Sequence, residues 1–387
     1  MRYHAVVVGA GLVGTACALA LEQRGLQVAM IESRPPSEPA PDWDSRIYAI
    51  SPASQSLLES LGVWGRMDSS RLQAVYRMDV FGDGAGVLRL DAYDSGTGRL
   101  ATILESGRLQ WALWQAARQS INLEILSPAA IREIRFGQPV SRLALEDGRE
   151  LETELVIGAD GRDSWVRAQA GFQALLESYA QLGVVANFAV DGRHQGTAFQ
   201  WFRNDGVLAW LPLPGERMSM VWSTAEAHGR ELLALDEPTL CARVAKAGQN
   251  RLGTLSLLTP AAAFPLRLMK LAEICKPGVA LVGDAAHGVH PLAGQGVNLG
   301  FGDVDSLAAH LANRGRAGCG DVRILAAHAR ARAEPVARMQ AVTDNLHDLF
   351  ARTDKLSGTL RNAGMSLLNR LPVAKSALVR EAMGITD

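Results

Sequence analysis

The first 32 residues alternate between apolar runs and a glycine-rich turn. Residues 3–8 are apolar and partly β-branched, which predicts a buried strand. The run leads directly into Gly9-Ala10-Gly11-Leu12-Val13-Gly14, and a helical pattern follows until Gly25 ends it. A second apolar run, 26–31, ends on Glu32. The pattern therefore predicts a strand–helix–strand unit.

The glycines of this unit have the spacing that a bound dinucleotide requires. The first allows a tight turn, the second lets a pyrophosphate approach the backbone, and the third lets helix and strand pack closely. The diphosphate then lies at the helix N-terminus, which favours negative charge. Glu32 follows Gly14 by 18 residues, as expected for an acid that binds ribose hydroxyls. A carboxylate there disfavours a 2′-phosphate, so the tight ligand should be FAD or NAD. The alternative is a glycine-rich turn without a ligand.

A second segment of the same kind follows near the middle of the chain. The apolar run 155–157 predicts a short strand that ends in Gly158-Ala159-Asp160-Gly161, and Ser164 could cap a following helix. By itself, the segment could equally be an ordinary strand-to-helix connection.

The third segment is an unbroken stretch from Gly283 to Gly300. It supplies an acidic residue, a His-Pro step and a Gly-Gln-Gly turn, all of which could hold a flavin. His287 and His290 also raise the possibility of a metal site. Their spacing would suit metal ligands only on a helix, and Pro291 argues against a helix there. We expect the histidines to hydrogen-bond and expect no metal.

Between the second and third segments the chain is rich in predicted strands. These are 182–190, 197–202, 207–213 and 217–223, separated by Asp-Gly, Asn-Asp-Gly and Pro-Gly-Glu turns. Three of them carry one tryptophan each: Trp201, Trp210 and Trp222. The tryptophans could pack in a core or form an aromatic wall for a substrate.

The positions of these segments predict the domain organisation. The dinucleotide-binding domain must be discontinuous, because its parts lie near residues 9, 160 and 284. From Glu334 onward an apolar stripe of 3.6-residue period predicts helix. The predicted parts are 1–178 for the first part of the FAD domain (in which 70–100 is a possible excursion to the substrate sheet), 179–268 for the substrate sheet, 269–333 for the second part and 334–387 for a helical region.

Composition narrows the class of protein. At 387 residues and a net charge of −1, the chain can bury a large core, and it suggests no nucleic-acid partner. The four cysteines have no paired spacing, which argues for a reducing compartment. No apolar run approaches the ~18 residues that would span a bilayer. We therefore expect a cytoplasmic protein that is soluble or peripheral to the inner membrane.

The three segments, in this order, resemble the class of single-component flavin aromatic hydroxylases. The finer pattern of 290–303 resembles the signature of the ubiquinone-biosynthesis hydroxylases, as does 44–51. Segments such as Leu61-Gly62-Val63-Trp64 resemble the branch that acts late in that pathway. The resemblance covers the whole chain, with one departure. Where the class often has Arg, Gln or Asn, this chain has Ser106, and Arg108 is offset from that position.

The resemblance implies a fold and a reaction. The fold would be a glutathione-reductase-like α/β Rossmann FAD domain with an inserted antiparallel β-sheet substrate domain and a C-terminal helical region. The protein would be a flavin-dependent aromatic-ring monooxygenase that uses FAD, NAD(P)H and O2. Its C4a-hydroperoxyflavin would hydroxylate a polyprenyl phenol or quinol in ubiquinone biosynthesis.

The resemblance and the glycine pattern also give candidate site residues. Flavin-positioning residues, with no protein nucleophile, are Pro291, Gly294, Gln295 and Gly296. Cofactor-binding residues are Gly9, Gly11, Leu12, Val13, Gly14, Glu32, Arg46, Asp160, Gly283, Asp284, Gly296, Val297 and Asn298.

Other functions stay open on the sequence alone. The chain could hydroxylate a soluble aromatic acid, with Arg193 or Arg203 as the carboxylate anchor. It could instead be a structural flavoprotein in a ubiquinone-biosynthesis complex. The tail from Arg352 carries Lys355, Arg361 and further basic residues among leucines. That tail could contact an anionic membrane or simply pack on the domain.

Overall fold

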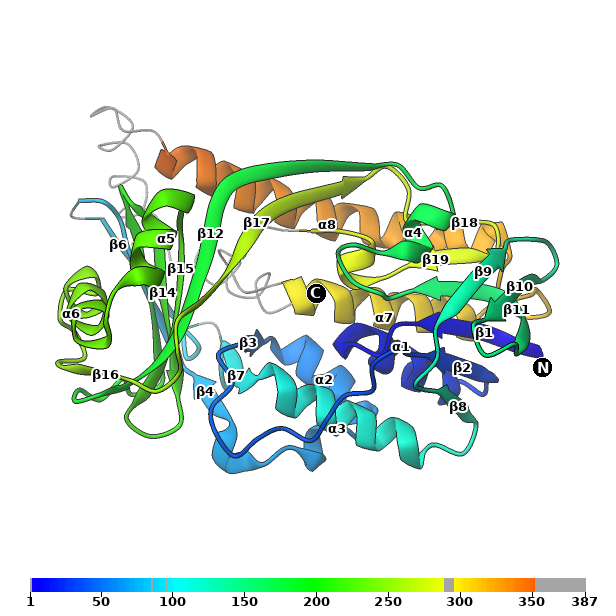
Figure 1. Cartoon of the computed structure of the whole chain (residues 1–387), viewed down its shortest axis with the longest axis horizontal. Helices are drawn as coiled ribbons and strands as arrows, with labels where there is room; N and C mark the ends of the chain where they lie inside the picture. The colour runs from blue at the N-terminus through cyan, green and yellow to red at the C-terminus, as the bar shows by residue number, and fades with distance from the viewer. Residues whose placement is uncertain (1, 85, 95, 289–295, 352–387) are drawn as a thin grey trace.

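The computed structural model describes residues 2–84, 86–94, 96–288 and 296–351. Two large sheets stand at opposite ends of the molecule, and two long strands arch from one to the other (Figure 1). Helices fill the layer beneath this arch. The arrangement confirms the predicted α/β fold with a second, largely antiparallel sheet.

The first sheet is built around the N-terminal strand. Its strand order is β18-β19-β11-β1-β2-β8, and β9 and β10 extend it beside β11. The four pairs that join β19, β11, β1, β2 and β8 are parallel. The bounds are β1 (Arg2–Val8), β2 (Val28–Ile31), β8 (Leu123–Leu126), β9 (Ile131–Arg135), β10 (Ser141–Leu145), β11 (Glu150–Gly158), β18 (Cys275–Lys276) and β19 (Val279–Leu281). Parallel strands covered on both faces are apolar throughout, which explains why β1 and β2 read as unbroken apolar runs.

Helices cover this sheet and form the larger core. Their bounds are α1 (Leu12–Glu22), α2 (Pro52–Ser60), α3 (Ser106–Gln119), α4 (Trp165–Gln169), α7 (Gly296–Ala312) and α8 (Val322–Ala351). Leu19 of α1, Leu113 of α3 and Leu307 of α7 are buried together with Val7 of β1. Gly25 has a φ of +76° just past the end of α1, so it ends that helix as predicted.

The second sheet is antiparallel except for one pair. Its order is β16-β12-β15-β14-β13-β5-β6, with β17 also beside β12, and only β13 and β5 pair in parallel. The bounds are β5 (Arg77–Phe81), β6 (Val87–Asp91), β12 (Ala174–Val190), β13 (Thr197–Arg203), β14 (Gly206–Leu213), β15 (Arg217–Ala225), β16 (Leu255–Leu257) and β17 (Ala262–Leu271). All four predicted strands of this block are present. The first begins eight residues early, at Ala174, because it continues into the arch with β17.

The three tryptophans of the second sheet pack in a core. Trp201, Trp210 and Trp222 are 2%, 1% and 0% exposed, and they lie in one cluster with residues of α5 (Glu226–Ala234) and α6 (Glu237–Ala247). These helices cover the face turned away from the first sheet (Figure 1). Core packing is therefore confirmed. The alternative prediction, an aromatic wall for a substrate, was wrong, because strand alternation turns all three rings away from the first sheet.

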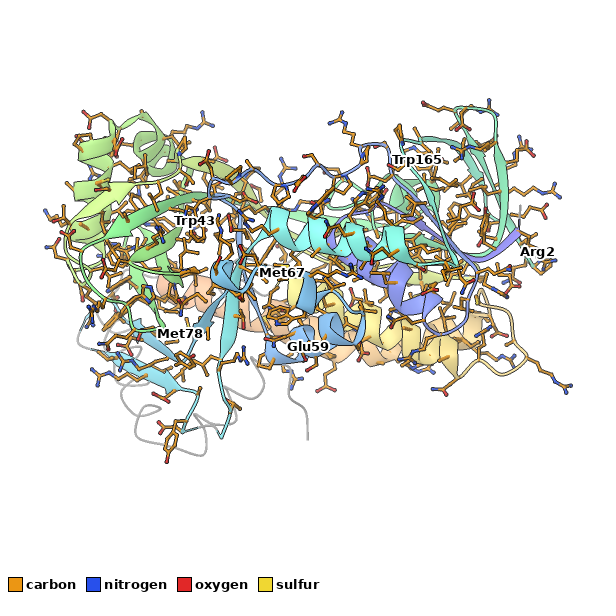
Figure 2. The ribbon with its side chains drawn as sticks, turned by 90° about the horizontal axis from the view of Figure 1, so that it is seen from below. Arg2, Trp43, Glu59, Met67, Met78 and Trp165 are labelled. Carbon is orange, nitrogen blue, oxygen red and sulfur yellow. The ribbon has the colours of Figure 1, made fainter. Side chains whose placement is uncertain are left out.

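A small sheet lies between the two large ones. It consists of β3 (Ile47–Ile50), β7 (Ala101–Glu105) and β4 (Gln73–Val75) in the order β3-β7-β4. Ile103 of β7 is buried against Ala198 of the second sheet, and Trp43 and Met78 pack on the same cluster (Figure 2). This contact fixes which face of the second sheet is turned toward the first.

The last described helix is longer than its sequence pattern predicts. We expected helix from Glu334, but α8 begins at Val322 and carries Pro335 in its interior. The prediction followed the apolar stripe, which is clear only from Glu334 onward. The basic tail from Arg352 lies outside the described residues. Within the described part of the chain, no helix combines the length and hydropathy that a bilayer crossing requires.

Candidate functional site

The turn between β1 and α1 has the geometry that its glycines predict. Gly9 has a φ of +102°, and a Cβ there would lie 2.6 Å from the Ala159 carbonyl oxygen. A Cβ on Gly14 would lie 2.0 Å from the carbonyl oxygen of Gly9, so strand and helix are in close contact. A Cβ on Gly11 would meet nothing within 4 Å. The middle glycine therefore leaves open space at the N-terminus of α1, while the other two allow close packing.

Glu32 closes one side of this turn. One carboxylate oxygen accepts a hydrogen bond from the Ala10 N–H at 2.7 Å, and the other accepts from the Arg34 N–H at 2.8 Å. The carboxylate is thereby held beside the glycine loop at the end of β2. The first of these oxygens keeps a further lone pair, so the group can still accept from a ribose hydroxyl, while the second also accepts from the Ser33 hydroxyl at 3.4 Å.

The second segment lies directly against the first. Asp160 accepts hydrogen bonds from the Ser164 hydroxyl at 2.5 Å and from the Val166 N–H at 3.0 Å, and Ser164 caps α4 as predicted. Its Cα lies 2.9 Å from the position of a Cβ on Gly9. Asp160 thus shapes the turn behind the glycine loop, and its carboxylate is already bound by α4.

The third segment is joined to both of the others. Arg167 of α4 donates to the Ala285 carbonyl at 3.2 Å, and its guanidinium is buried. A Cβ on Gly283 would lie 3.1 Å from Val13 of α1, and a Cβ on Gly300 of α7 would lie 2.5 Å from the same side chain. The three segments therefore meet around the first turn of α1, although they are far apart in the sequence.

Asp284 is the exposed residue of the short turn Gly283–Ala285, whose two other members are buried. Gly296 is the first residue of α7, and Val297 and Asn298 follow in its first turn. The Asn298 side chain donates to the Ala49 carbonyl at 2.9 Å and accepts from the Ser51 N–H at 3.0 Å, so it holds α7 to β3. Pro291, Gly294, Gln295 and His290 lie outside the described residues.

A buried carboxylate holds the third segment in place. Asp303 of α7 is 0% exposed and accepts hydrogen bonds from the Gly283 N–H at 2.9 Å, from His287 Nε2 at 2.6 Å and from Arg332 Nε at 2.8 Å. Burial alone would raise the pKa of Asp303, but His287, Arg332 and the Gly283 N–H outweigh burial and lower it to about 2. Burial likewise opposes charge on His287, but Asp303 raises the pKa of that imidazole. The expected hydrogen-bonding role of His287 is confirmed.

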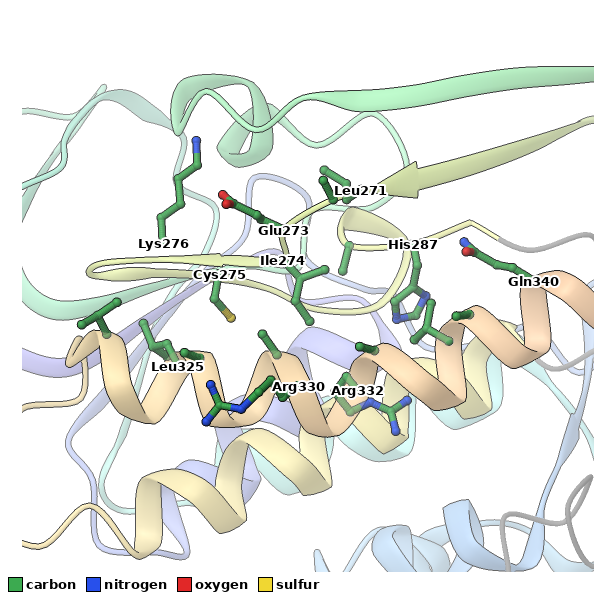
Figure 3. Close-up of a pocket in the computed structure, with 18 residues that line it drawn as sticks. Leu271, Glu273, Ile274, Cys275, Lys276, His287, Leu325, Arg330, Arg332 and Gln340 are labelled. Atoms are coloured by element: carbon green, nitrogen blue, oxygen red, sulfur yellow. The ribbon is translucent and has the colours of Figure 1, made fainter.

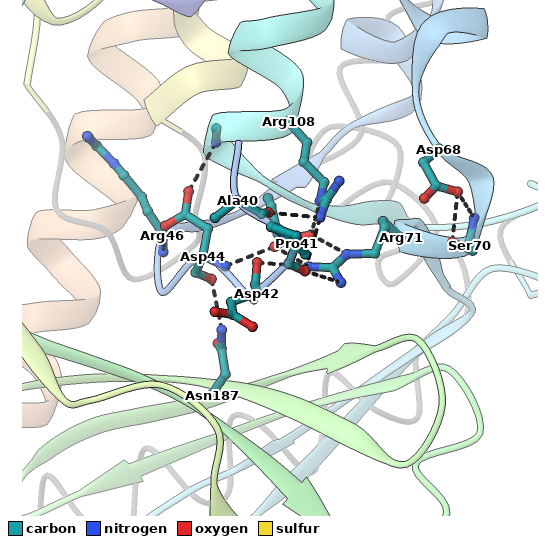
Figure 4. Close-up of polar contacts among 12 residues, drawn as sticks. Ala40, Pro41, Asp42, Asp44, Arg46, Asp68, Ser70, Arg71, Arg108 and Asn187 are labelled. Atoms are coloured by element: carbon teal, nitrogen blue, oxygen red, sulfur yellow. Dashed lines mark hydrogen bonds and ion pairs between the residues drawn. The ribbon is translucent and has the colours of Figure 1, made fainter. Parts of the chain in front are cut away.

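A second buried carboxylate anchors the strap that crosses between the two large sheets, residues 40–46 (Figure 4). Glu105 pairs with Arg71 at 2.7 Å and with Arg108 at 2.9 Å, and it accepts the Asp44 N–H at 2.9 Å. On the other side, Asn187 of the second sheet donates to the Asp44 carbonyl at 2.8 Å. Arg108 is thus committed to Glu105 and the strap.

Arg46 lies at the end of this strap and is exposed. Its guanidinium carbon lies 5.7 Å from the centre of the Tyr48 ring. Burial raises the pKa of the Tyr48 phenol, and the carboxylate of Asp284 acts in the same direction. Both Arg46 and Asp284 therefore act electrostatically on Tyr48, and of the two the Arg46 guanidinium contacts its ring.

A groove of about 510 Å³ lies on another side of the 283–288 loop, between α8 and residues 271–276 (Figure 3). Its lining is mostly apolar and includes the side chains of His287 and Arg332. Asp284 is not among the lining residues. The groove therefore lies on one side of the 283–288 loop, and it does not include the glycine turn after β1.

The arrangement fits FAD. The open space before Gly11, at the N-terminus of an apolar helix, suits a diphosphate. Glu32 is held where an adenosine ribose would follow, and Asp284 is exposed at the far side of the same loop cluster. The first turn of α7 presents further backbone N–H groups. Among the described residues no cluster of His, Cys, Asp or Glu could hold a metal ion.

Sequence reasoning missed several residues of this site. Asp303 and Arg332 are 29 positions apart, so no local spacing reveals their ion pair. The Gln110 side chain of α3 donates to the Ala10 carbonyl at 3.4 Å. Gln110 lies one helical turn after Ser106, the position where the resembled class often has Arg, Gln or Asn. Glu105 could have been suspected, because an acid at the end of an apolar strand and beside Arg108 is uncommon in a core.

Comparison with known proteins gives consistent results. The family model described as FAD binding domain matches residues 2–344. The chain is 35% identical to 3-demethoxyubiquinol 3-hydroxylase of Escherichia coli, with 98% of each chain covered. It is 32% identical to ubiquinone hydroxylase of Rhodospirillum rubrum, covering 98% of this chain and 89% of that protein.

Solved structures share the fold. A probable FAD-dependent monooxygenase from Pseudomonas aeruginosa superposes with a TM-score of 0.79 at 22% identity, covering 94% of this chain and 99% of that one. The p-nitrophenol 4-monooxygenase of Pseudomonas putida gives a TM-score of 0.78 at 18% identity, covering 97% and 96%. At these identities the likeness concerns the fold alone.

Proposed function

Since the chain belongs to the FAD-binding-domain family, we propose that it is an FAD-dependent monooxygenase that hydroxylates the ring of a polyprenyl phenol or quinol in ubiquinone biosynthesis. The relatives named above, which match over nearly their full length, act on ubiquinone or its demethoxy precursor. Bound FAD would supply the redox chemistry and the activation of O2, with electrons from NAD(P)H.

The proposal assigns roles to the predicted cofactor residues. The N–H groups at the start of α1 would hold the diphosphate, with Gly11 leaving room for it. Glu32 would accept from the adenosine ribose, and Asp284 would accept from the ribityl chain. The first turn of α7, from Gly296, would turn its N–H groups toward the part of the flavin where negative charge builds. Pro291, Gly294 and Gln295 keep their predicted flavin-positioning role as part of the proposal.

The observation that carries the substrate class is the face of the second sheet turned toward the flavin layer. Ala209, Val221 and Val185 lie side by side in one row on that face, and Val80 continues the row on the other side of Gln200. A largely apolar row suits a ring that carries an isoprenoid, because each buried CH₂ contributes about 0.8 kcal/mol. It also keeps water from the reacting atoms.

The anchors that a soluble aromatic acid would need are committed elsewhere. Arg203 pairs with Asp205 at 2.7 and 2.9 Å and lies 5.6 Å from the Trp222 ring, on the outward face of the sheet. The Arg193 side chain is 83% exposed and lies 3.9 Å from Glu216. The Arg203 guanidinium is therefore not on the face turned toward the flavin layer, and the Arg193 guanidinium is largely exposed to solvent, which favours the prenylated substrate.

The proposal includes a place of action. A polyprenyl substrate resides in a bilayer, so the protein would act from the cytoplasm at the surface of the inner membrane or within a ubiquinone-biosynthesis complex. Flotation with liposomes, with and without a long-chain prenylated phenol, tests the membrane contact. Recovery of the protein only at the bottom of the gradient in both cases would refute it.

The deciding assay measures how much of the NADPH consumed leads to hydroxylated product. Purified holoenzyme is given NADPH and either a prenylated phenol or 4-hydroxybenzoate, and NADPH consumption, H2O2 and hydroxylated product are quantified. We expect product to match NADPH consumption only for the prenylated phenol, because a poorly filled site admits water and releases H2O2. Asp284→Ala, reconstituted with FAD, supplies the background rate.

If hydroxylated product matched NADPH consumption only with 4-hydroxybenzoate, the protein would instead be a hydroxylase of a soluble aromatic acid. Absence of coupled product from either compound would point to the structural role in an assembly. Quinone profiling of a deletion strain then identifies the intermediate that accumulates, and hence the ring position.

A further inference from the structure

One amide interrupts an apolar row on the face of the second sheet that is turned toward the flavin layer. The strand register places seven residues in one row across this face: Leu88, Val80, Gln200, Ala209, Val221, Val185 and Ala262. Six of them are apolar, and Gln200 is the exception. The residue is 5% exposed, so most of its side chain is buried.

The neighbours of Gln200 along its own strand are apolar as well. Ala198 and Phe202 share its face by strand alternation and are 4% exposed each. Ala198 packs against the small sheet β3-β7-β4, and Phe199 and Trp201 on either side of Gln200 belong to the outward core. The amide of Gln200 is therefore directed to the flavin side of the sheet.

The Gln200 side chain makes no hydrogen bond within the described part of the chain. Its amide atoms are not among the fully enclosed polar atoms that lack a partner, so part of the amide surface stays open to a ligand. The buried amide of Gln340, by contrast, donates to the Met269 and Gly288 carbonyls, and that of Asn187 donates to the Asp44 carbonyl, although the Asn187 Oδ1 atom has no partner. A buried polar group without a partner costs free energy that a leucine of similar size would avoid. A site that must recognise a polar atom of a ligand gains specificity from such a group.

We propose that Gln200 is a specificity residue that hydrogen-bonds an oxygen substituent on the substrate ring. The inference rests on the proposed function, because it takes the ligand to be a prenylated phenol or quinol. An amide both donates and accepts, so it can bind a hydroxyl or an ether oxygen. The apolar remainder of the row binds the ring and the start of the prenyl chain, and the single amide fixes which way round the ring lies.

The test compares wild type with Gln200→Leu, each as FAD holoenzyme, against two probes: a 2-prenylphenol and the prenylbenzene that lacks its hydroxyl. Anaerobic titration, followed by the change in flavin absorption, gives four dissociation constants. Wild type should prefer the phenol by about 3- to 10-fold, the range of one net hydrogen bond. In the leucine variant this preference should disappear, with little change for prenylbenzene.

Thermal unfolding of the ligand-free holoenzymes separates this role from a structural one. Gln200→Leu removes an unpaired amide from an apolar surface, so its midpoint should equal or exceed that of wild type. Gln169→Leu, at an exposed position of α4, is the matched control and should change neither the midpoint nor the preference.

Two results would overturn the inference while leaving the proposed function intact. One is an unchanged preference for the phenol in Gln200→Leu. The other is a clear fall in its unfolding midpoint, which would show that the amide supports the fold. Failure of wild type to bind or hydroxylate any prenylated phenol would instead remove the proposed function, and the inference with it.

Discussion

Replacing Asp303 by asparagine should loosen the whole cofactor loop. The carboxylate receives three donors, from Gly283, His287 and Arg332, and is fully buried. Asparagine has the same shape but no charge, and its NH₂ group would face one of these donors. The guanidinium of Arg332, itself 9% exposed, would then lack its counter-ion.

The size of the effect follows from two estimates. Lowering the pKa of Asp303 from 3.8 to about 2 corresponds to about 2 kcal/mol of stability at neutral pH. Removing one partner of a buried ion pair costs about 3–5 kcal/mol. We therefore expect Asp303→Asn to lose about 3 kcal/mol of unfolding free energy. The contribution of the charge is present above pH 3.8 and is lost as the pH falls toward 2, so the variant should approach wild type in strong acid.

Urea unfolding at pH 7 and fluorescence titration with FAD measure the two consequences. Gly283 has a φ of +61° and its N–H is bound by Asp303, so FAD affinity should fall together with stability. Asp305→Asn, two residues along the same helix and exposed, should stay within about 0.5 kcal/mol of wild type. If Asp303→Asn unfolds within 1 kcal/mol of wild type and binds FAD equally well, the carboxylate does not hold the loop.

Three further predictions concern single sites. Asp284→Ala should weaken FAD binding by about 1–3 kcal/mol in a fluorescence titration, yet leave unfolding of the apoprotein unchanged because the side chain is exposed. Gly300→Ala would place a methyl 2.5 Å from Val13, so urea unfolding should show a loss of about 1–3 kcal/mol, whereas Gly65→Ala, with nothing within 4 Å, should show none. Burial lowers the pKa of His328 to about 4, so the unfolded chain takes up a proton below pH 6.5 before the folded protein does. The unfolding free energy should therefore fall by up to about 3 kcal/mol between pH 6.5 and 4. Urea unfolding of His328→Gln at pH 7 and pH 5 should show a smaller difference between the two pH values than wild type. An equal difference in the variant would contradict the assignment.

The parts of the fold that the sequence predicts are those with local signals. The glycine loop after β1, the end of α1 at Gly25 and the strands of the second sheet each combine a period of hydrophobicity with a turn residue. Ser164 was predicted as a cap because capping requires only a hydroxyl at the right position. These features depend on a few consecutive residues.

What the sequence did not predict depends on partners that are distant in the chain. Which face of β13 carries Trp201 is decided by α5 and α6, and an alternating strand is compatible with either orientation. The ion pairs of Asp303 and of Glu105 join residues 29 and 34 positions apart. The start of α8 was placed too late because the prediction used only the apolar stripe from Glu334, whereas α8 starts at Val322 and packs against α7.

The distribution of the cofactor loop along the chain has a consequence for synthesis. The glycine turn after β1 leaves the ribosome among the first residues, but its sheet neighbour β11 ends only at Gly158, and Arg332, which holds Asp303, follows far later. At about 5–20 residues per second, the nascent chain exists for many seconds with a complete glycine motif but an incomplete FAD site. FAD should therefore load only once nearly the whole chain has emerged. A ribosome-stalled chain ending before α8 should not retain it, so cofactor capture acts as a checkpoint on completed molecules.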